Sequence, residues 1–180
     1  MAQSLARLQR WFRDTSGRLP SPVEIVPDYD VVFGQRYRDG AVIGEDGKGT
    51  ADFADHATLS GEPGTRAPHV PIIQAGKEGS TLDLFGRDFV LLSASEDWDT
   101  ATSKLSNDAL GLRFRQFSAG MLARGKENLT GAFGVGAGGA VLVRPDGFVA
   151  WRTNELPRDP AGSLVAVLRQ LGCSGHPPLR

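Results

Sequence analysis

The side chains that could act as nucleophiles, redox groups or metal ligands are few in this chain, and they are scattered. The single cysteine, Cys173, excludes an internal disulfide, a CxxC redox pair and a cysteine-rich zinc site. The three histidines, His56, His69 and His176, share no metal-ligand spacing with one another. No G-x-S-x-G nucleophile elbow is present, although a Ser-His-Asp triad assembled by the fold stays open. The residues therefore predict no catalytic group and no metal site.

Two glycine-containing segments match phosphate-binding motifs only in part. Gly134–Gly139 contains G-x-G-x-x-G, but a dinucleotide fingerprint needs a strand before it and a helix after it. Here a strand is predicted directly after the glycines. Lys48 is followed by Gly49, where a P-loop requires Ser or Thr. We interpret both segments as loops and expect no bound cofactor.

The first half of the chain is predicted to be irregular. Residues 1–20 favour a helical arm, capped by Ser4 and ended near Gly17. Residues 21–79 form a loop-rich lead-in, rich in proline, with short strands predicted at Val31–Phe33 and Val70–Ile73. The small, polar stretch from Gly44 to Gly64 is expected to be mobile.

Residues 80–173 carry stronger signals and are predicted to be one domain, followed by a tail over 174–180. Asp88–Ala94 and Gly139–Arg144 are nearly continuous apolar runs, which is typical of strands buried on both faces. Between them we expect a helix over Thr100–Leu110 and an alternating strand over Leu112–Gln116.

The end of this domain is predicted in most detail. Pro145-Asp146-Gly147 is a turn sequence and leads into a return strand over Phe148–Arg152. Asp159 caps a final helix that has Pro160 at its first position. The resulting order of strands and helices contains a βαβ unit and a terminal hairpin with a covering helix. It predicts an α/β fold of the thioredoxin-like sandwich type.

Length and charge narrow the class of protein. The 180 residues include 20 Lys+Arg and 21 Asp+Glu, which gives a net charge of −1. Without a basic excess the chain is a poor match for nucleic acid. No apolar run approaches the length of a membrane span, and the N-terminus lacks the apolar core of a secretory signal. We therefore expect one globular domain, with or without an arm, that is cytoplasmic and does not bind a membrane.

Four segments with characteristic residue sequences follow one another along the chain: Arg36–Val42, Gly64–Val70, Thr81–Leu92 and Gly139–Arg152. Together they resemble the C-terminal domain of FAD-dependent aromatic hydroxylases of the phenol- and polyketide-hydroxylase type. The resemblance covers about residues 23–172. It implies a thioredoxin-like domain that lacks the redox dithiol.

By this resemblance, the WCxxC position of thioredoxins maps to Trp98–Thr102, and the cis-proline position maps near Gly139. Asp99 and Thr102 stand where the two thiols would be. A carboxylate and a hydroxyl cannot exchange disulfides, because that chemistry requires a thiolate. The FAD- and substrate-binding domains have no counterpart here, so no flavin-binding residue can be carried over. A peroxidase role for Cys173 is disfavoured, because this residue follows the final helix.

Two functions stay open. The first is a non-catalytic accessory protein, of the free-standing kind found with aromatic polyketide antibiotic pathways, that binds an aromatic metabolite or a biosynthetic partner. Tyr37 or Trp98 would stack on the ligand, and Arg66 and His69 would make polar contacts, although such aromatics more often pack in a core or at an edge. The second is a C-terminal subunit or fragment of an FAD-dependent hydroxylase with a dimerising or stabilising role. Met1 and the arm favour a complete short protein, and a homodimer is compatible with either function.

Overall fold

The computed structural model describes residues 28–38, 40–45, 53, 60–74, 76–103, 105, 113–118, 120 and 126–173. The predicted arm, the tail, most of the stretch expected to be mobile and most of the C-terminal half of the helix predicted over Thr100–Leu110 lie outside these residues. None of the helices in the described part of the chain is long and apolar enough to cross a bilayer.

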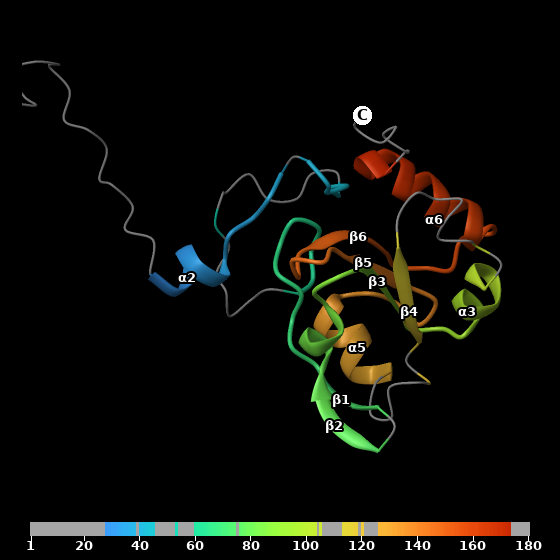
Figure 1. The fold of residues 1–180 in the computed structure, drawn as a ribbon, viewed down its shortest axis with the longest axis horizontal. Coiled ribbons are helices and arrows are strands. Elements are labelled where there is room, and N and C mark those ends of the chain that lie inside the picture. Colours follow the sequence, from blue (N-terminus) through green and yellow to red (C-terminus); the bar gives the residue numbers. More distant parts are fainter. Residues whose placement is uncertain are drawn as a thin grey trace, which may run out of the picture.

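A four-stranded sheet forms the centre of the molecule (Figure 1). Its strands are β3 (Phe89–Ser93), β4 (Phe114–Ser118), β5 (Ala140–Val143) and β6 (Val149–Thr153), in the order β4-β3-β5-β6. β3 and β4 are parallel and are connected through α3 (Asp97–Thr102), whereas β5 is antiparallel to both of its neighbours. The predicted α/β architecture of a thioredoxin-like sandwich is confirmed.

Apolar side chains fill both faces of this sheet, because β3 and β5 contain almost nothing else. Val90 and Leu92 lie in one core cluster with Leu129 and Phe133 of α5 (Lys126–Phe133). Leu91 lies in a second cluster, on the opposite face. Its other members include Trp98 of α3, Leu142 of β5, and Leu164 and Leu168 of α6 (Pro160–Leu168). Each fully buried Leu or Val contributes about 1.5–3 kcal/mol, so the two clusters supply much of the driving force for folding.

The terminal hairpin and helix form as their sequences predict. Gly147 has a φ of +83°, its N–H donates to the carbonyl of Arg144 at 3.0 Å, and the Arg144 N–H donates to the carbonyl of Phe148 at 2.8 Å. A carboxylate oxygen of Asp159 accepts from the N–H of Gly162 at 2.9 Å, which caps α6. The chain then continues in a short π-helical turn, η3 (Arg169–Cys173).

The lead-in differs from its prediction in two elements, α2 (Asp28–Phe33) and β2 (Lys77–Ser80). Val31–Phe33 belongs to the helix α2 and not to a strand. The β-branched residues favour a strand only weakly, and tertiary context overrides that preference. β1 (Pro71–Gln74) matches the expected strand within a residue, but it pairs with the unforeseen strand β2, which leads into the 3₁₀ turn η2 (Thr81–Leu84). In the domain that follows, α3 begins three residues before the predicted helix start, and so it includes Trp98.

Residues 64–67 run along the outer edge of the sheet. The Gly64 N–H donates to Val149 at 2.8 Å, the Val149 N–H donates to Thr65 at 2.9 Å, and the Ala67 N–H donates to Gly147 at 2.8 Å. These bonds use backbone groups of β6 that would otherwise face water at an open edge. The final residues of the stretch expected to be mobile are therefore packed against the fold, and Gly61, Pro63 and Gly64 are buried.

A buried arginine ties a more distant part of the lead-in to the same core. Nε and Nη2 of Arg152 donate to the two carboxylate oxygens of Glu45 at 2.5 and 3.1 Å. Its Nη1 donates to the carbonyls of Ser60 and Phe133, both at 2.8 Å. Only 5% of the Arg152 side chain is exposed. The guanidinium therefore joins β6, α5 and the lead-in at one point.

Candidate functional site

Polar groups hold α3 in place, at the position that the family resemblance assigns to the thioredoxin dithiol. Trp98 is completely buried, and its Nε1 donates to the carbonyl of Gly138 at 3.0 Å. The Thr102 hydroxyl donates to the Trp98 carbonyl at 2.7 Å, and Nε2 of Gln116 donates to a carboxylate oxygen of Asp99 at 2.6 Å. None of these groups is a thiol, and a buried indole offers no face to a ligand. Trp98 is a core residue, so we leave it out of the candidate site.

The glycine-rich loop does not fit a dinucleotide. It lies between α5 and β5, so a helix precedes it and a strand follows it. The amides of Gly136 and Gly139 are bonded to the carbonyls of Asn154 and Gly136, at 3.1 and 2.9 Å, and are not offered to a phosphate. A Cβ at Gly139 would lie 2.5 Å from the carbonyl oxygen of Thr153. The glycines permit close packing against the end of β6, which confirms the interpretation as a loop.

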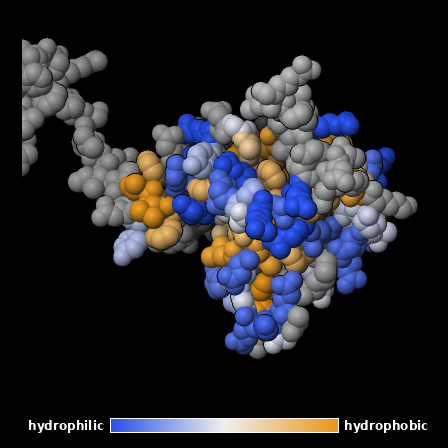
Figure 2. All heavy atoms as spheres, viewed as in Figure 1, coloured by the Kyte–Doolittle hydropathy of each residue, from blue (hydrophilic) through white to orange (hydrophobic). Residues whose placement is uncertain are grey.

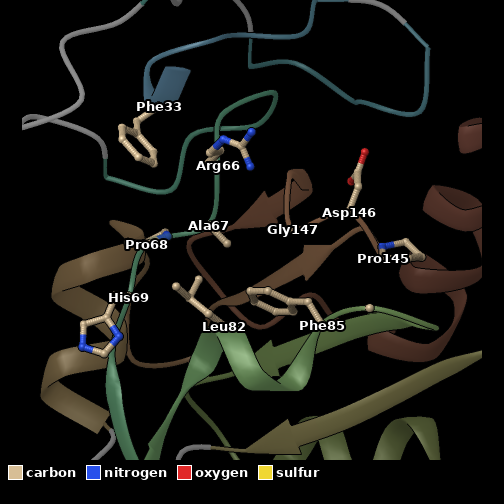
Figure 3. Close-up of a pocket in the computed structure, with 11 residues that line it drawn as sticks. Phe33, Arg66, Ala67, Pro68, His69, Leu82, Phe85, Pro145, Asp146 and Gly147 are labelled. Atoms are coloured by element: carbon tan, nitrogen blue, oxygen red, sulfur yellow. The ribbon is translucent and has the colours of Figure 1, made fainter. Parts of the chain in front are cut away.

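The main cavity lies where the lead-in, η2 and the hairpin turn converge, and its volume is about 620 Å³ (Figure 3). Figure 3 shows Phe33 of α2 on one side and Leu82 and Phe85, in and after η2, on the opposite side. The extended segment Arg66–His69 and the turn Pro145–Gly147 complete its wall. Short, proline-containing connections thus hold the lining residues, while the sheet and its edge fix where those connections lie.

Arg66 contributes a cation to this wall that has no counter-ion among the described residues. The Arg66 guanidinium carbon lies 4.7 Å from the centroid of the Phe148 ring, and its Nε is buried without a hydrogen-bond partner. The nearby acid, Asp146, is already paired, since Nη2 and Nε of Arg144 lie 2.5 and 3.0 Å from its two carboxylate oxygens. Within the described residues, no carboxylate forms an ion pair with Arg66.

His69 lies in the same wall, two residues beyond Ala67. Its Nδ1 is 2.7 Å from the hydroxyl of Ser80, which also accepts from the N–H of Leu82 at 3.0 Å. The donor and acceptor roles of Nδ1 and the hydroxyl depend on the tautomer. In either case the serine fixes the orientation of the imidazole, and the exposed ring can offer Nε2 to a ligand.

Of the four predicted ligand contacts, the structure brings together Arg66 and His69 and separates the other two. Tyr37 packs edge-on against the Phe148 ring, with ring centroids 4.7 Å apart, and it lines a smaller hollow that shares no lining residue with the main cavity. Phe33, Leu82 and Phe85 were missed as lining residues. Their only signal in the sequence was apolar character in segments without a predicted core role.

The smaller hollow, of about 170 Å³, also contains an acid with a shifted pKa. Partial burial raises the pKa of Glu62, but hydrogen bonds from the Ser60 hydroxyl and from backbone N–H groups, together with the nearby Arg152 guanidinium, outweigh this effect. The pKa therefore lies below the ordinary value of 4.5. Glu62 stays ionised at neutral pH and adds a second negative charge beside Arg152.

Among the residues that the structure describes, no three His, Cys, Asp or Glu side chains gather as metal ligands would. The sequence-based expectation of no metal site stays a prediction, because His56 and His176 lie outside those residues.

Comparison with known proteins identifies the relatives of this fold. The profile of the family described as "Aromatic-ring hydroxylase, C-terminal" matches residues 60–173. The chain is 38% identical to 4-methyl-5-nitrocatechol 5-monooxygenase of Burkholderia sp, over 83% of this chain and 29% of that enzyme. It is 39% identical to aklavinone 12-hydroxylase RdmE of Streptomyces purpurascens, over 79% of this chain and 27% of that enzyme.

Solved structures give the same picture. The ternary complex of aklavinone-11 hydroxylase with FAD and aklavinone superposes with a TM-score of 0.75 at 38% identity, covering 81% of this chain and 28% of that one. The flavin-dependent monooxygenase PieE, in complex with FAD and substrate, gives a TM-score of 0.59 at 31% identity, with 79% and 26% covered. The chain thus spans less than a third of the length of the relatives that it matches.

Proposed function

This chain belongs to the family of C-terminal domains of aromatic-ring hydroxylases, and on that premise we propose that it is a non-catalytic docking part of an FAD-dependent aromatic hydroxylase. Its partner is the flavin- and substrate-binding part of such an enzyme, whether in the same polypeptide or as a separate protein. The thioredoxin-like sandwich is retained, whereas Asp99 and Thr102 replace the thiols that redox chemistry requires. A scaffold without these thiols can still serve to bind the flavin- and substrate-binding part.

The observation that carries the docking proposal is the apolar surface of α2. Tyr29, Val31, Val32 and Phe33 are 67%, 44%, 54% and 47% exposed. Figure 2 shows an orange patch over α2, away from the body of the sheet. Contiguous exposed apolar residues mark interaction surfaces, because their exposure to water is unfavourable. A helix of six residues is also too short to be stable alone, so contact with a partner would stabilise it.

The place of α2 in the chain favours the flavin- and substrate-binding part as the occupant. The family profile describes a C-terminal domain, so in the relatives that part precedes the region matched here. α2 comes first among the described elements and lies to one side of the central sheet (Figure 1), so a part that precedes it in the chain would be joined next to it. Self-association of two chains through the same patch is the competing outcome.

A chimaera tests docking. Residues 28–173 would replace the matching segment of aklavinone 12-hydroxylase of Streptomyces purpurascens, and flavin content and thermal unfolding would be measured. We expect the chimaera to retain flavin, and we expect Val32→Glu to lower its melting temperature because a charge would enter the buried interface. Leu156→Glu is the matched control, since Leu156 is 37% exposed on another part of the surface.

Equal effects of Val32→Glu and Leu156→Glu would contradict the proposal. Sedimentation of the unmodified chain addresses the competing outcome: a dimer that Val32→Glu dissociates would assign the patch to self-association.

A second candidate function, binding of an aromatic metabolite, is favoured by the main cavity. Its volume of about 620 Å³ lies in the range typical of small-molecule sites. Two phenylalanines and an unpaired arginine line it, and Asp146 and His69 supply further polar groups. Phe33 belongs both to the α2 patch and to the wall of the cavity, so the docking surface and the cavity are adjacent.

A further inference from the structure

We infer that the main cavity selects an aromatic monoanion, a fused-ring aromatic carboxylate, with the guanidinium of Arg66 as its charge partner. This inference rests on the second candidate function and specifies the chemical class of its ligand. It does not depend on the docking proposal.

The argument for an anion begins with the state of Arg66. A guanidinium has five N–H donors, and burial of any of them without an acceptor is unfavourable. The buried Nε of Arg66 has no acceptor, and no carboxylate of the described residues forms an ion pair with this side chain. An anion in the cavity would supply the counter-ion that Arg66 lacks among the described residues. A carboxylate fits best, because its two oxygens match the planar fork of a guanidinium.

The ring of Phe148 prepares Arg66 for this contact. The guanidinium carbon lies 4.7 Å from the ring centroid, which fits a cation stacked on an aromatic face. Phe148 itself is held by the edge contact of Tyr37 and is 4% exposed. The orientation of Arg66 is therefore fixed before a ligand arrives, and the entropy cost of ordering a long side chain is reduced.

The walls indicate an aromatic body of more than one ring. Phe33 lies opposite Leu82 and Phe85 across the cavity (Figure 3), and Pro68 and Pro145 add further apolar surface. Leu82 and Phe33 are 48% and 47% exposed, so a flat apolar ligand between them would remove both from water. The volume of about 620 Å³ exceeds what a single ring would fill.

The charges of the wall also limit the ligand to one negative charge. The Asp146 carboxylate is held in the wall by Arg144, with contacts of 2.5 and 3.0 Å, so it cannot turn away from a second anionic group. It would repel such a group, as like charges do at short range. His69 can instead hydrogen-bond a neutral phenol through Nε2, since its Nδ1 is used by Ser80.

Titration of the full chain with a matched pair of probes tests the inference. The probes are 3-hydroxy-2-naphthoate and its neutral isostere 3-hydroxy-2-naphthamide, with binding followed by calorimetry and by chemical shifts of the cavity residues. We expect the acid to bind about tenfold or more tightly than the amide, which is the usual effect of one charge-assisted hydrogen bond. Added salt should lower the affinity for the acid and leave the affinity for the amide unchanged.

Variants assign the preference to Arg66. In Arg66→Gln the acid and the amide should bind equally, whereas Arg66→Lys should keep part of the preference for the acid, because it retains the charge and loses the fork. Arg158→Gln is the matched control, since Arg158 is exposed and lies outside the cavity. An unchanged amide affinity in Arg66→Gln shows that the cavity has stayed folded. If that variant unfolds, the salt dependence of acid binding and the affinities of Arg66→Lys still test whether Arg66 is the charge partner.

Each contrary outcome has a distinct meaning. Equal binding of acid and amide by the unmodified chain would overturn the anion assignment and leave aromatic binding standing. A preference for the acid that survives Arg66→Gln would overturn the role of Arg66. Binding of neither probe at millimolar concentration would overturn the inference together with the second candidate function. Docking through α2 would be unaffected, because the chimaera tests it separately.

Discussion

Arg152 is a buried charged side chain whose loss should strongly destabilise the fold. Its guanidinium donates to both Glu45 oxygens and to two carbonyls, and only 5% of the side chain is exposed. Arg152→Met would fill a similar volume but remove the two hydrogen bonds to Glu45 and those to the carbonyls of Ser60 and Phe133. Removal of one partner of a buried ion pair costs about 3–5 kcal/mol, and the partial exposure of Glu45 places the expected loss at the lower end of that range.

Urea unfolding of Arg152→Met measures this loss, with Arg158→Met as the control at an exposed arginine. The control should change the free energy of unfolding by no more than about 0.5 kcal/mol. A similar small change in both variants would show that Arg152 does not join the lead-in to the core in solution.

Single side chains show how far a sequence can specify a site. Arg66 and His69 were predicted as polar ligand contacts in the extended, proline-containing segment Arg66–His69, and the structure places both in the wall of one cavity. That they contact a ligand stays a prediction. Trp98 was misjudged as a ligand contact because its position after a buried strand says nothing about the direction of its ring. That direction is set by the helix α3, which begins at Asp97. The helix places the indole in the core cluster that includes Leu164 and Leu168 of α6.

Among the helices, α6 has the clearest local determinant, the cap at Asp159. Its carboxylate accepts from the Gly162 N–H at 2.9 Å. Asp159→Ala should lower the free energy of unfolding by about 1 kcal/mol, because one of the first N–H groups of the helix would lose its acceptor. Thermal unfolding measures the effect, and Glu155→Ala serves as the control at an exposed acid outside the helix. An equal effect of both variants would contradict the capping role.

The strands of the central sheet could be predicted, whereas α2 and β2 of the lead-in could not, for a physical reason. β3 and β5 are apolar on both faces, and a central strand is the structure that buries such a run. α2 has no such pattern. Its valines favour a strand, yet no sheet edge of the described residues lies beside them to pair with. The pairing of residues 64–67 with β6 was equally invisible, because its backbone bonds depend on no side-chain pattern.

The sandwich as a unit includes part of the lead-in, which bears on the predicted domain boundary at residue 80. Ala67, Val70 and Ile72 lie in the same core cluster as the sheet, and residues 64–67 cover β6. A fragment of residues 80–173 would lose about 4 kcal/mol from Val70 and Ile72 alone, a large fraction of the stability of an ordinary domain.

We therefore expect residues 28–173 to unfold cooperatively and residues 80–173 to lack a cooperative transition. Circular dichroism during heating distinguishes the two fragments. A shorter fragment that melts as sharply as the longer one would support the boundary at residue 80 and show that the covering segment is dispensable.

The contacts of α3 bear on whether a redox dithiol could be engineered into this fold. Two exchanges, Asp99→Cys and Thr102→Cys, would introduce the C-x-x-C spacing of thioredoxins. They would also remove the acceptor of Gln116 and the bond from Thr102 to the Trp98 carbonyl, and the second sulfur would stand at a position that is 4% exposed. A thiol so enclosed ionises poorly and is out of reach of an oxidised protein. The surroundings of α3 would have to change as well, so two mutations are not enough to install disulfide exchange.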